Sequence, residues 1–227
     1  MFKFKVIARI APLLLLPLLF GGITLAKAQS VSAYLGFGAA TDSSNGQELE
    51  CNSNTAGCAP GTGVPNPDIG PNLNGAFGVF GADFMWKPTL GFGGEYSWRL
   101  AQEQFAPQDG FTIRPSFYDF NVIWHPIGKG TRVVPEIQGG IGGENTKFYE
   151  TATGCISGSI GCSTISQYLD SSNHFQIHFS GGVRLYVKGG LYIRPQVDVH
   201  WVNNFVEFGS GWVPEYTVAV GYTFGGH

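Results

Sequence analysis

The sequence predicts an all-β protein: an eight-stranded antiparallel up-and-down transmembrane β-barrel with short periplasmic turns and long extracellular loops. Bulky apolar residues alternate with small or polar residues in eight segments, and this period of two places each set on one face of a strand. The connections alternate strictly between short and long, as expected for a barrel closed across a membrane. With 34 Gly, 14% aromatic and only 13% charged residues, the composition is too apolar for a disordered chain.

The first 28 residues have the organisation of a secretory signal peptide. Lys3 and Arg9 belong to a basic start, a Leu-rich apolar stretch follows, and the small residues of an Ala-Lys-Ala segment end at Ala28. The apolar stretch of about 14 residues is shorter than the roughly 20 that a spanning helix needs. We expect cleavage after Ala28, with residues 29–227 forming the barrel domain.

The charge balance excludes one class of partner. Loss of residues 1–28 leaves nine Lys and Arg against sixteen Asp and Glu, a net charge of −7. A nucleic-acid-binding protein needs a basic face, so we expect no nucleic acid partner.

The strand pattern is clearest at the end of the chain. From Tyr216 to Phe224 every second residue is bulky and apolar, and small residues lie between them. Segments of about 9 to 12 residues with this rhythm cross a bilayer when tilted. The eight predicted strands are 31–40, 75–86, 90–100, 111–124, 132–146, 174–187, 191–202 and 213–224. In the fourth, the apolar set changes phase, which predicts a β-bulge near Phe117.

The connections divide into two classes. The short ones are 87–89, 126–131 and 188–190, and the long ones are 41–74, 101–110, 147–173 and 203–212. An even number of strands places both ends of the barrel domain on the short-turn side.

This combination of strand rhythm, loop alternation and the run Tyr216 to Phe224 resembles the superfamily of small bacterial outer-membrane β-barrels, which includes the OmpA-like transmembrane domain. The resemblance implies a location in the bacterial outer membrane. It also implies insertion by the barrel assembly machinery, which recognises a C-terminal strand ending in an aromatic residue. Here Phe224 takes that place, although three residues follow it.

The apolar face is expected to contact outer-membrane lipid. Arg99, Arg114, Arg184 and Arg194 all fall in the polar set, and an Arg facing lipid at mid-depth would cost about 2–4 kcal/mol. Aromatic residues also gather at both ends of the strands, as in the girdles of membrane barrels. They are Trp86, Trp124, Tyr222 and Phe224 on the short-turn side, and Trp98, Trp201, Trp212 and Tyr216 on the long-loop side. A soluble barrel with its apolar face turned inward around a ligand is the alternative.

The polar set would then line the interior. Its titratable members are Glu95, Arg99, Arg114, Asp119, Glu136, Glu144, His178, Arg184, Arg194, Asp198, His200 and Glu215. The interior of an eight-stranded barrel is wide enough only for its own side chains, and buried charges must be paired. We expect an ion-pair network that plugs the lumen. A narrow path for small solutes is the second interpretation.

The four cysteines form two pairs of equal spacing: Cys51 with Cys58 in the first long loop, and Cys155 with Cys162 in the third. Export to an oxidising compartment favours disulfides, and we expect each pair to bridge locally. Three connectivities are open. A zinc site is less compatible with the spacing, which is wider than the usual two to four residues.

We expect no enzyme, cofactor or metal site. A faint resemblance to a lipid A deacylase pattern comes from His200 and Glu215, but the nucleophile position is Val202, which cannot attack a carbonyl. The sequence therefore predicts a non-enzymatic barrel whose long loops serve envelope integrity, adhesion or recognition of an extracellular partner. A solute pore is the alternative, and a lipid A-modifying enzyme comes third.

Overall fold

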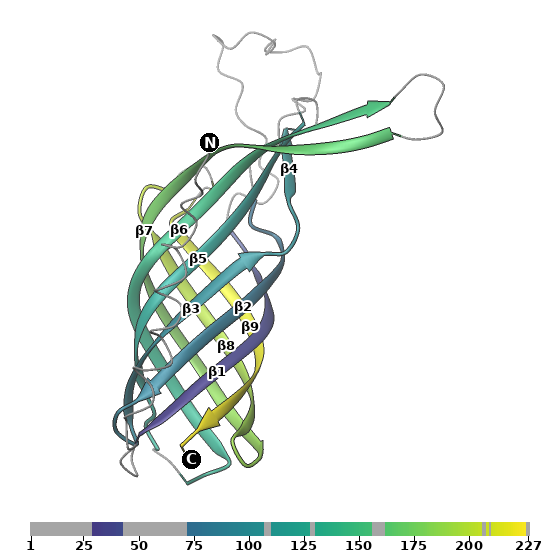
Figure 1. Ribbon diagram of the computed structural model, residues 1–227. Coiled ribbons are helices and arrows are strands. Elements are labelled where there is room, and N and C mark those ends of the chain that lie inside the picture. The colour runs from purple at the N-terminus through teal and green to yellow at the C-terminus, as the bar shows by residue number, and fades with distance from the viewer. Residues whose placement is uncertain are drawn as a thin grey trace, which may run out of the picture.

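The chain forms a closed antiparallel β-barrel in the computed structural model (Figure 1). The structure describes residues 29–42, 72–106, 110–127, 130–155, 162–205, 208 and 210–225. The expected signal peptide, Cys51 and Cys58 lie outside these residues. Among the described residues, no helix is long and apolar enough to cross a membrane.

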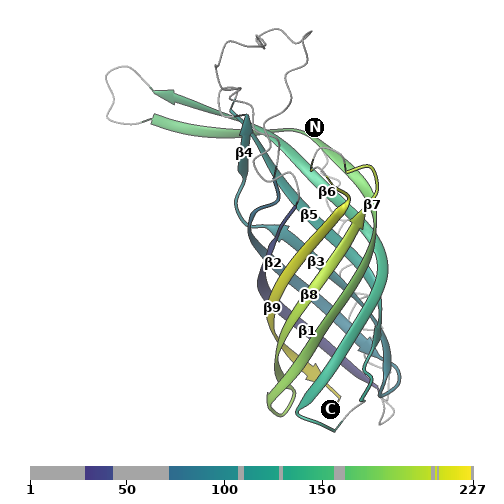
Figure 2. The same ribbon diagram turned by 180° about the vertical axis from the view of Figure 1, so that it is seen from behind.

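The barrel wall confirms the predicted fold class. The strands are β1 (Ser30–Ala40), β2 (Gly75–Met85), β3 (Leu90–Arg99), β4 (Glu103–Ala106), β5 (Phe111–Trp124), β6 (Val133–Cys155), β7 (Cys162–Lys188), β8 (Leu191–Val202) and β9 (Trp212–Phe224). Because β1 pairs with β9 and β3 pairs with β5, eight strands close into a ring. The remaining strand, β4, has four residues and adds to the outer part of β5. The strands wind obliquely around the barrel, as both sides of the molecule show (Figures 1 and 2).

The expected long loop at 147–173 is wrong as a description of this segment. β6 and β7 continue beyond the barrel as a hairpin that is paired as far as Cys155 and Cys162, with one register shift between Phe148 and Tyr149. The hairpin leans away from the barrel axis (Figures 1 and 2). Outside the bilayer no lipid imposes an apolar face, so the side chains lose their alternation, while pairing between the two backbones continues.

The predicted bulge near Phe117 is also wrong. β5 pairs without a register shift with β3 and with β6 on either side of this residue. The apparent change of phase arises because Ile113 and Phe117 point inward, where both are completely buried. The outer end of the lumen is therefore apolar. Because the inner face of β5 carries apolar residues there, alternation of hydrophobicity does not show which face points inward.

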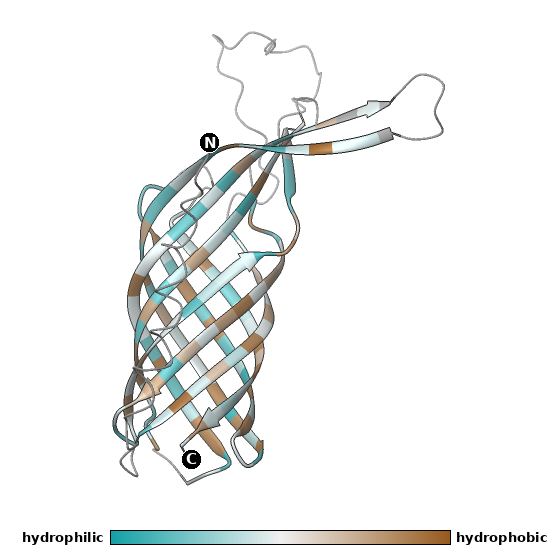
Figure 3. Cartoon of the chain, viewed as in Figure 1, coloured by the Kyte–Doolittle hydropathy of each residue, from teal (hydrophilic) through white to brown (hydrophobic). Residues whose placement is uncertain are grey.

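Hydrophobic and hydrophilic residues alternate along the strands (Figure 3), and the apolar ones are those exposed on the exterior. Many large apolar side chains on this face are more than half exposed, among them Phe37 (67%), Phe120 (71%), Val122 (60%) and Ile141 (58%). Inward-pointing neighbours such as Asp119 are buried. This is the inverse of a soluble barrel and excludes the ligand-enclosing alternative, because a wall of this kind is stable only against hydrocarbon.

The glycine run of β6 permits close contact with β5. A Cβ atom on Gly140 would collide with the carbonyl oxygen of Phe120. By contrast, a Cβ on Gly181, in the neighbouring strand β7, would have no atom within 4 Å.

Gly140→Ala should therefore lower the free energy of unfolding by about 1–3 kcal/mol, because the extra methyl group overpacks the wall. Gly181→Ala is the matched control and should change it by less than about 0.5 kcal/mol. Urea unfolding in detergent micelles, followed by Trp fluorescence, measures both. Equal effects of the two substitutions would contradict this account of Gly140.

Candidate functional site: the charged interior

Glu136 of β6 is the hub of the charged interior. Arg184 Nε donates to its Oε2 at 2.5 Å, and Arg194 Nε donates to its Oε1 at 2.9 Å. His125 Nε2 lies 2.7 Å from Oε2, and the Gln138 amide donates to Oε1 at 2.8 Å. Glu136 is only 1% exposed, so this carboxylate exchanges water for two guanidinium groups and two further partners.

The two arginines carry the network across the lumen. Arg184 projects from β7 to Asp83 of β2, with 2.5 Å between Nη2 and Oδ2. Arg194 projects from β8 to Glu95 of β3, with 3.1 Å between Nη1 and Oε2. Both arginines are 1% exposed. Ion pairs thus tie opposite walls of the barrel together.

Two tyrosines fill the space around these ion pairs. The Arg194 guanidinium lies 4.1 Å from the ring centroid of Tyr34, and that of Arg184 lies 5.1 Å from the ring of Tyr192. The Tyr34 hydroxyl donates to Glu95 at 2.8 Å. Both rings are nearly fully buried, so they add cation–π attraction and leave little room for water.

Two histidines form a second layer nearer the outer end. His178 places Nε2 at 2.9 Å from Asp198 Oδ1 and Nδ1 at 2.9 Å from Asn121 Oδ1. His200 Nε2 lies 3.2 Å from Glu215 Oε2. All five side chains are 4% exposed or less.

Asp119 completes a group that bears on metal binding. Its Oδ2 atom lies 4.0 Å from Nδ1 of His178 and 4.0 Å from Nδ1 of His200. One possible ligand atom from each of the three residues lies within 4.8 Å of the other two. The two imidazole rings are, however, stacked at 4.9 Å with 21° between their planes. A metal ion must lie in the plane of each ligating ring, and two stacked rings do not share such a point. We assign this trio to the packing of the interior.

An apolar cluster occupies the outer end of the lumen. Its buried members are Ala40, Leu73, Phe77, Ile113, Phe117, Val202, Phe205, Phe208 and Val213. Phe117 stacks on His200 with 4.6 Å between ring centroids, so the cluster rests directly on the polar layer. At the edge, Arg99 pairs with Glu103 at 2.5 Å.

The structure places nine of the ten expected network residues inside the barrel and buries them: Glu95, Arg99, Asp119, Glu136, Arg184, Arg194, Asp198, His200 and Glu215. The tenth, Arg114, was assigned to the wrong face. Since β5 continues without a bulge, Arg114 and Asp119 point to opposite sides of the wall, and Arg114 faces outward.

The sequence did not reveal Asp83, Tyr34 and His125 as members. Asp83 shares the inward face of β2 with the apolar Phe77 and Val79. Because that face is partly apolar, the alternation of β2 does not show that Asp83 points inward. Tyr34 points inward from β1 and is 3% exposed, but it is not one of the charged residues from which the network was predicted. His125 immediately follows β5, and outside a strand the alternation of inward and outward residues no longer predicts where a side chain points.

The geometry around His200 does not support hydrolysis. Its ring is stacked on both faces, by Phe117 and His178. Val202, at the position of a nucleophile, is buried in the apolar cluster. A nucleophile must lie within hydrogen-bond reach of its base and be open to substrate, and this arrangement provides neither.

Comparison with known proteins bears on the fold. No family model and no curated protein matches the chain. Among solved structures, Neisserial surface protein A is similar with a TM-score of 0.51 at 12% identity, over 88% of this chain and 98% of that one. Ail, the attachment invasion locus protein of Yersinia pestis, has a TM-score of 0.48 at 12% identity, covering 87% and 99% of the two chains. OprG from Pseudomonas aeruginosa has a TM-score of 0.46 at 12% identity, covering 87% and 96%.

The fold and the two faces of its wall define the class of protein. A closed ring of eight antiparallel strands with an apolar exterior and a polar, paired interior is an integral β-barrel of the bacterial outer membrane. At this level of identity the likeness to Neisserial surface protein A concerns the fold alone.

Proposed function

We propose that this barrel is a non-enzymatic component of the outer membrane with a closed lumen, which supports envelope integrity and presents its β6–β7 hairpin for recognition or adhesion. The observation that carries the proposal is the occupied interior. Ion pairs centred on Glu136 cross the lumen from wall to wall, and an apolar cluster lies above them.

A planar-bilayer recording tests the closed lumen. The purified barrel should give no reproducible unitary conductance, because ions would have to displace arginines that are 1% exposed. The second candidate, a narrow solute pore, predicts unitary steps. It also predicts that Asp198→Asn, which removes a charge 0% exposed within the lumen, changes their cation preference.

The hairpin is the part best suited to meet a partner. Beyond the barrel it exposes the apolar side chains Ile165 (66%), Tyr168 (51%) and Leu169 (43%). Among the described residues, the part of β7 that precedes Gln176 pairs with no strand other than β6, and an exposed strand edge offers a template for an added strand. These features favour a protein partner outside the cell.

A truncated hairpin separates this role from folding. Residues 150–167 would be replaced by a two-residue Asn-Gly turn, which suits an antiparallel hairpin. The barrel should retain its folded mobility on unheated gels and lose the proteins or cell surfaces that the full-length barrel captures. Equal capture by both forms would assign recognition elsewhere.

The register of the hairpin supports a local disulfide. Cys155 and Cys162 are directly opposed across β6 and β7, and opposed residues of an antiparallel pair have Cα atoms about 4.5–5.5 Å apart, within the range that a disulfide spans. We expect mass spectrometry of the unreduced protein to find this bridge, and separately one between Cys51 and Cys58. Four free thiols in the native protein would contradict both.

The ends of the barrel agree with the proposed export route. β1 begins at Ser30, immediately after the mature N-terminus expected at Gln29. At the other end, β9 ends with the outward aromatic Phe224, as expected of a strand presented to the barrel assembly machinery.

A further inference from the structure

A groove of about 430 Å³ lies on the outer wall of the barrel, away from the lumen. Its apolar part is formed by Leu35, Phe80, Tyr96 and Trp98, and its polar part includes Arg114 and Lys147. Leu35, Phe80 and Tyr96 are 40% to 58% exposed on the lipid-facing surface. The groove therefore opens toward the bilayer.

Two cations lie side by side in this groove. Arg114 of β5 and Lys147 of β6 are directly opposed in the register of the two strands, and like charges in this position repel each other. Among the described residues, no carboxylate lies within salt-bridge distance of either one. Arg114 Nε donates to the carbonyl of Arg99 at 2.9 Å, which holds the guanidinium while its other N–H groups remain able to donate.

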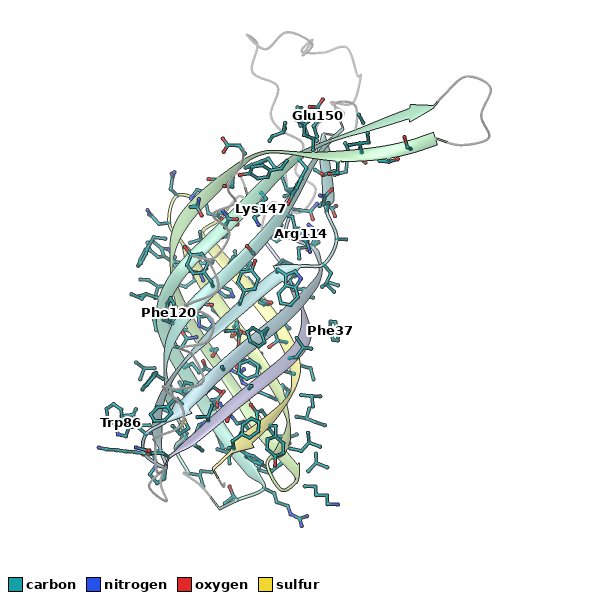
Figure 4. All side chains as sticks on the ribbon, in the orientation of Figure 1. Phe37, Trp86, Arg114, Phe120, Lys147 and Glu150 are labelled. Atoms are coloured by element: carbon teal, nitrogen blue, oxygen red, sulfur yellow. The ribbon has the colours of Figure 1, made fainter. Side chains whose placement is uncertain are left out.

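The depth of the pair in the membrane follows from the strand. Trp124, at the short-turn end of β5, is separated from Arg114 by ten residues. At about 3.3 Å per residue and a tilt of about 40°, the rise is about 25 Å, which is the height of the apolar band of such barrels. Figure 4 shows Arg114 and Lys147 near the end of the barrel that carries the hairpin, with Phe120 below them and Trp86 at the far end. The two cations thus lie where the headgroups of the outer leaflet begin.

We propose that this groove binds a phosphorylated lipid of the outer leaflet, with the phosphate between Arg114 and Lys147 and an acyl chain along Leu35, Phe80 and Tyr96. A phosphate there offsets the repulsion between the two cations, and Arg can bind it with two parallel N–H groups. The apolar floor faces hydrocarbon, so an acyl chain fits it better than a soluble anion or a protein. The proposal rests on the position of the barrel in the membrane and is independent of whether the lumen conducts.

Native mass spectrometry of the detergent-purified barrel, titrated with lipid A, tests the site. The wild type should retain lipid A, and the double variant Arg114→Gln/Lys147→Gln should bind it at least ten-fold more weakly. The matched control is Lys87→Gln/Lys188→Gln, which removes two exposed cations at the short-turn end and should bind like the wild type. Folding of each variant is checked by its mobility on unheated gels, and Arg114→Lys, which keeps the charge, should retain more lipid than Arg114→Gln.

Two further binding measurements identify the class of ligand. Phosphatidylethanolamine, whose headgroup is neutral overall, should bind more weakly than lipid A, and millimolar inorganic phosphate should not displace the lipid. Equal retention of lipid A by the double variant and the control would overturn the proposal. Displacement by inorganic phosphate would overturn it as well, because the site would then be one for a free anion.

Discussion

Glu136→Gln should lower the free energy of unfolding of the barrel by about 3–5 kcal/mol. The substitution preserves the shape of the side chain but leaves two arginines, each 1% exposed, without the carboxylate that both contact. Breaking a buried ion pair by removing one partner has this magnitude, because the remaining charge stays buried without compensation. Urea unfolding in micelles, followed by fluorescence of the five Trp residues, measures the change.

Glu103→Gln is the control for this prediction. Glu103 also pairs with an arginine, Arg99, but its side chain is 34% exposed at the rim. Water replaces much of the lost interaction there, so we expect a change of about 0–1 kcal/mol. If the two substitutions destabilised the barrel equally, Glu136 would not be the hub of a desolvated network.

Phe120→Arg should cost about 2–4 kcal/mol and reduce the yield of membrane-inserted protein. Phe120 is 71% exposed and lies on β5 between Trp124 at the short-turn end and Arg114 at the outer end, which places it near the middle of the apolar band. An Arg on the lipid face costs most at mid-depth. The fraction of folded protein after refolding into vesicles, with and without urea, reports the change.

Two controls separate depth from side-chain loss. Phe120→Leu keeps an apolar side chain and should insert normally. Val133→Arg places the same charge at the short-turn end of β6, where Val133 is 52% exposed, and should cost about 0–1 kcal/mol. A similar loss for both Arg variants would show that this exterior does not face hydrocarbon.

The barrel strands were predictable because the bilayer imposes a period of two on any strand that crosses it. Where lipid is absent, the rule fails, and the outer half of the β6–β7 hairpin was missed for that reason. The rule also fails where the lumen itself is apolar. Ile113 and Phe117 look like lipid-facing residues, and this misplaced Arg114 on the inner face.

The candidate site was predictable only in part. The alternation of side chains along a strand identifies which charged residues point inward, but it does not say which residues they meet across the lumen. Arg184 meets Asp83, which is 101 residues away in the chain, and Arg194 meets Glu95. Which residues face each other across the lumen depends on the tilt and stagger of the strands. These are properties of the closed ring rather than of a single strand.

The seam between β1 and β9 has a consequence for the time course of folding. The hydrogen bond between Ser32 and Thr223 joins residues 191 positions apart, so it forms only when the last strand meets the first. Arg184 and Arg194, from β7 and β8, reach partners on β2 and β3 through the same closure. Until that moment Asp83 and Glu95 cannot reach these arginines, so they stay hydrated even where Arg184 and Arg194 already meet Glu136 on β6. Expulsion of water and closure of the ring therefore coincide, and contacts of such long sequence separation make this the slow step.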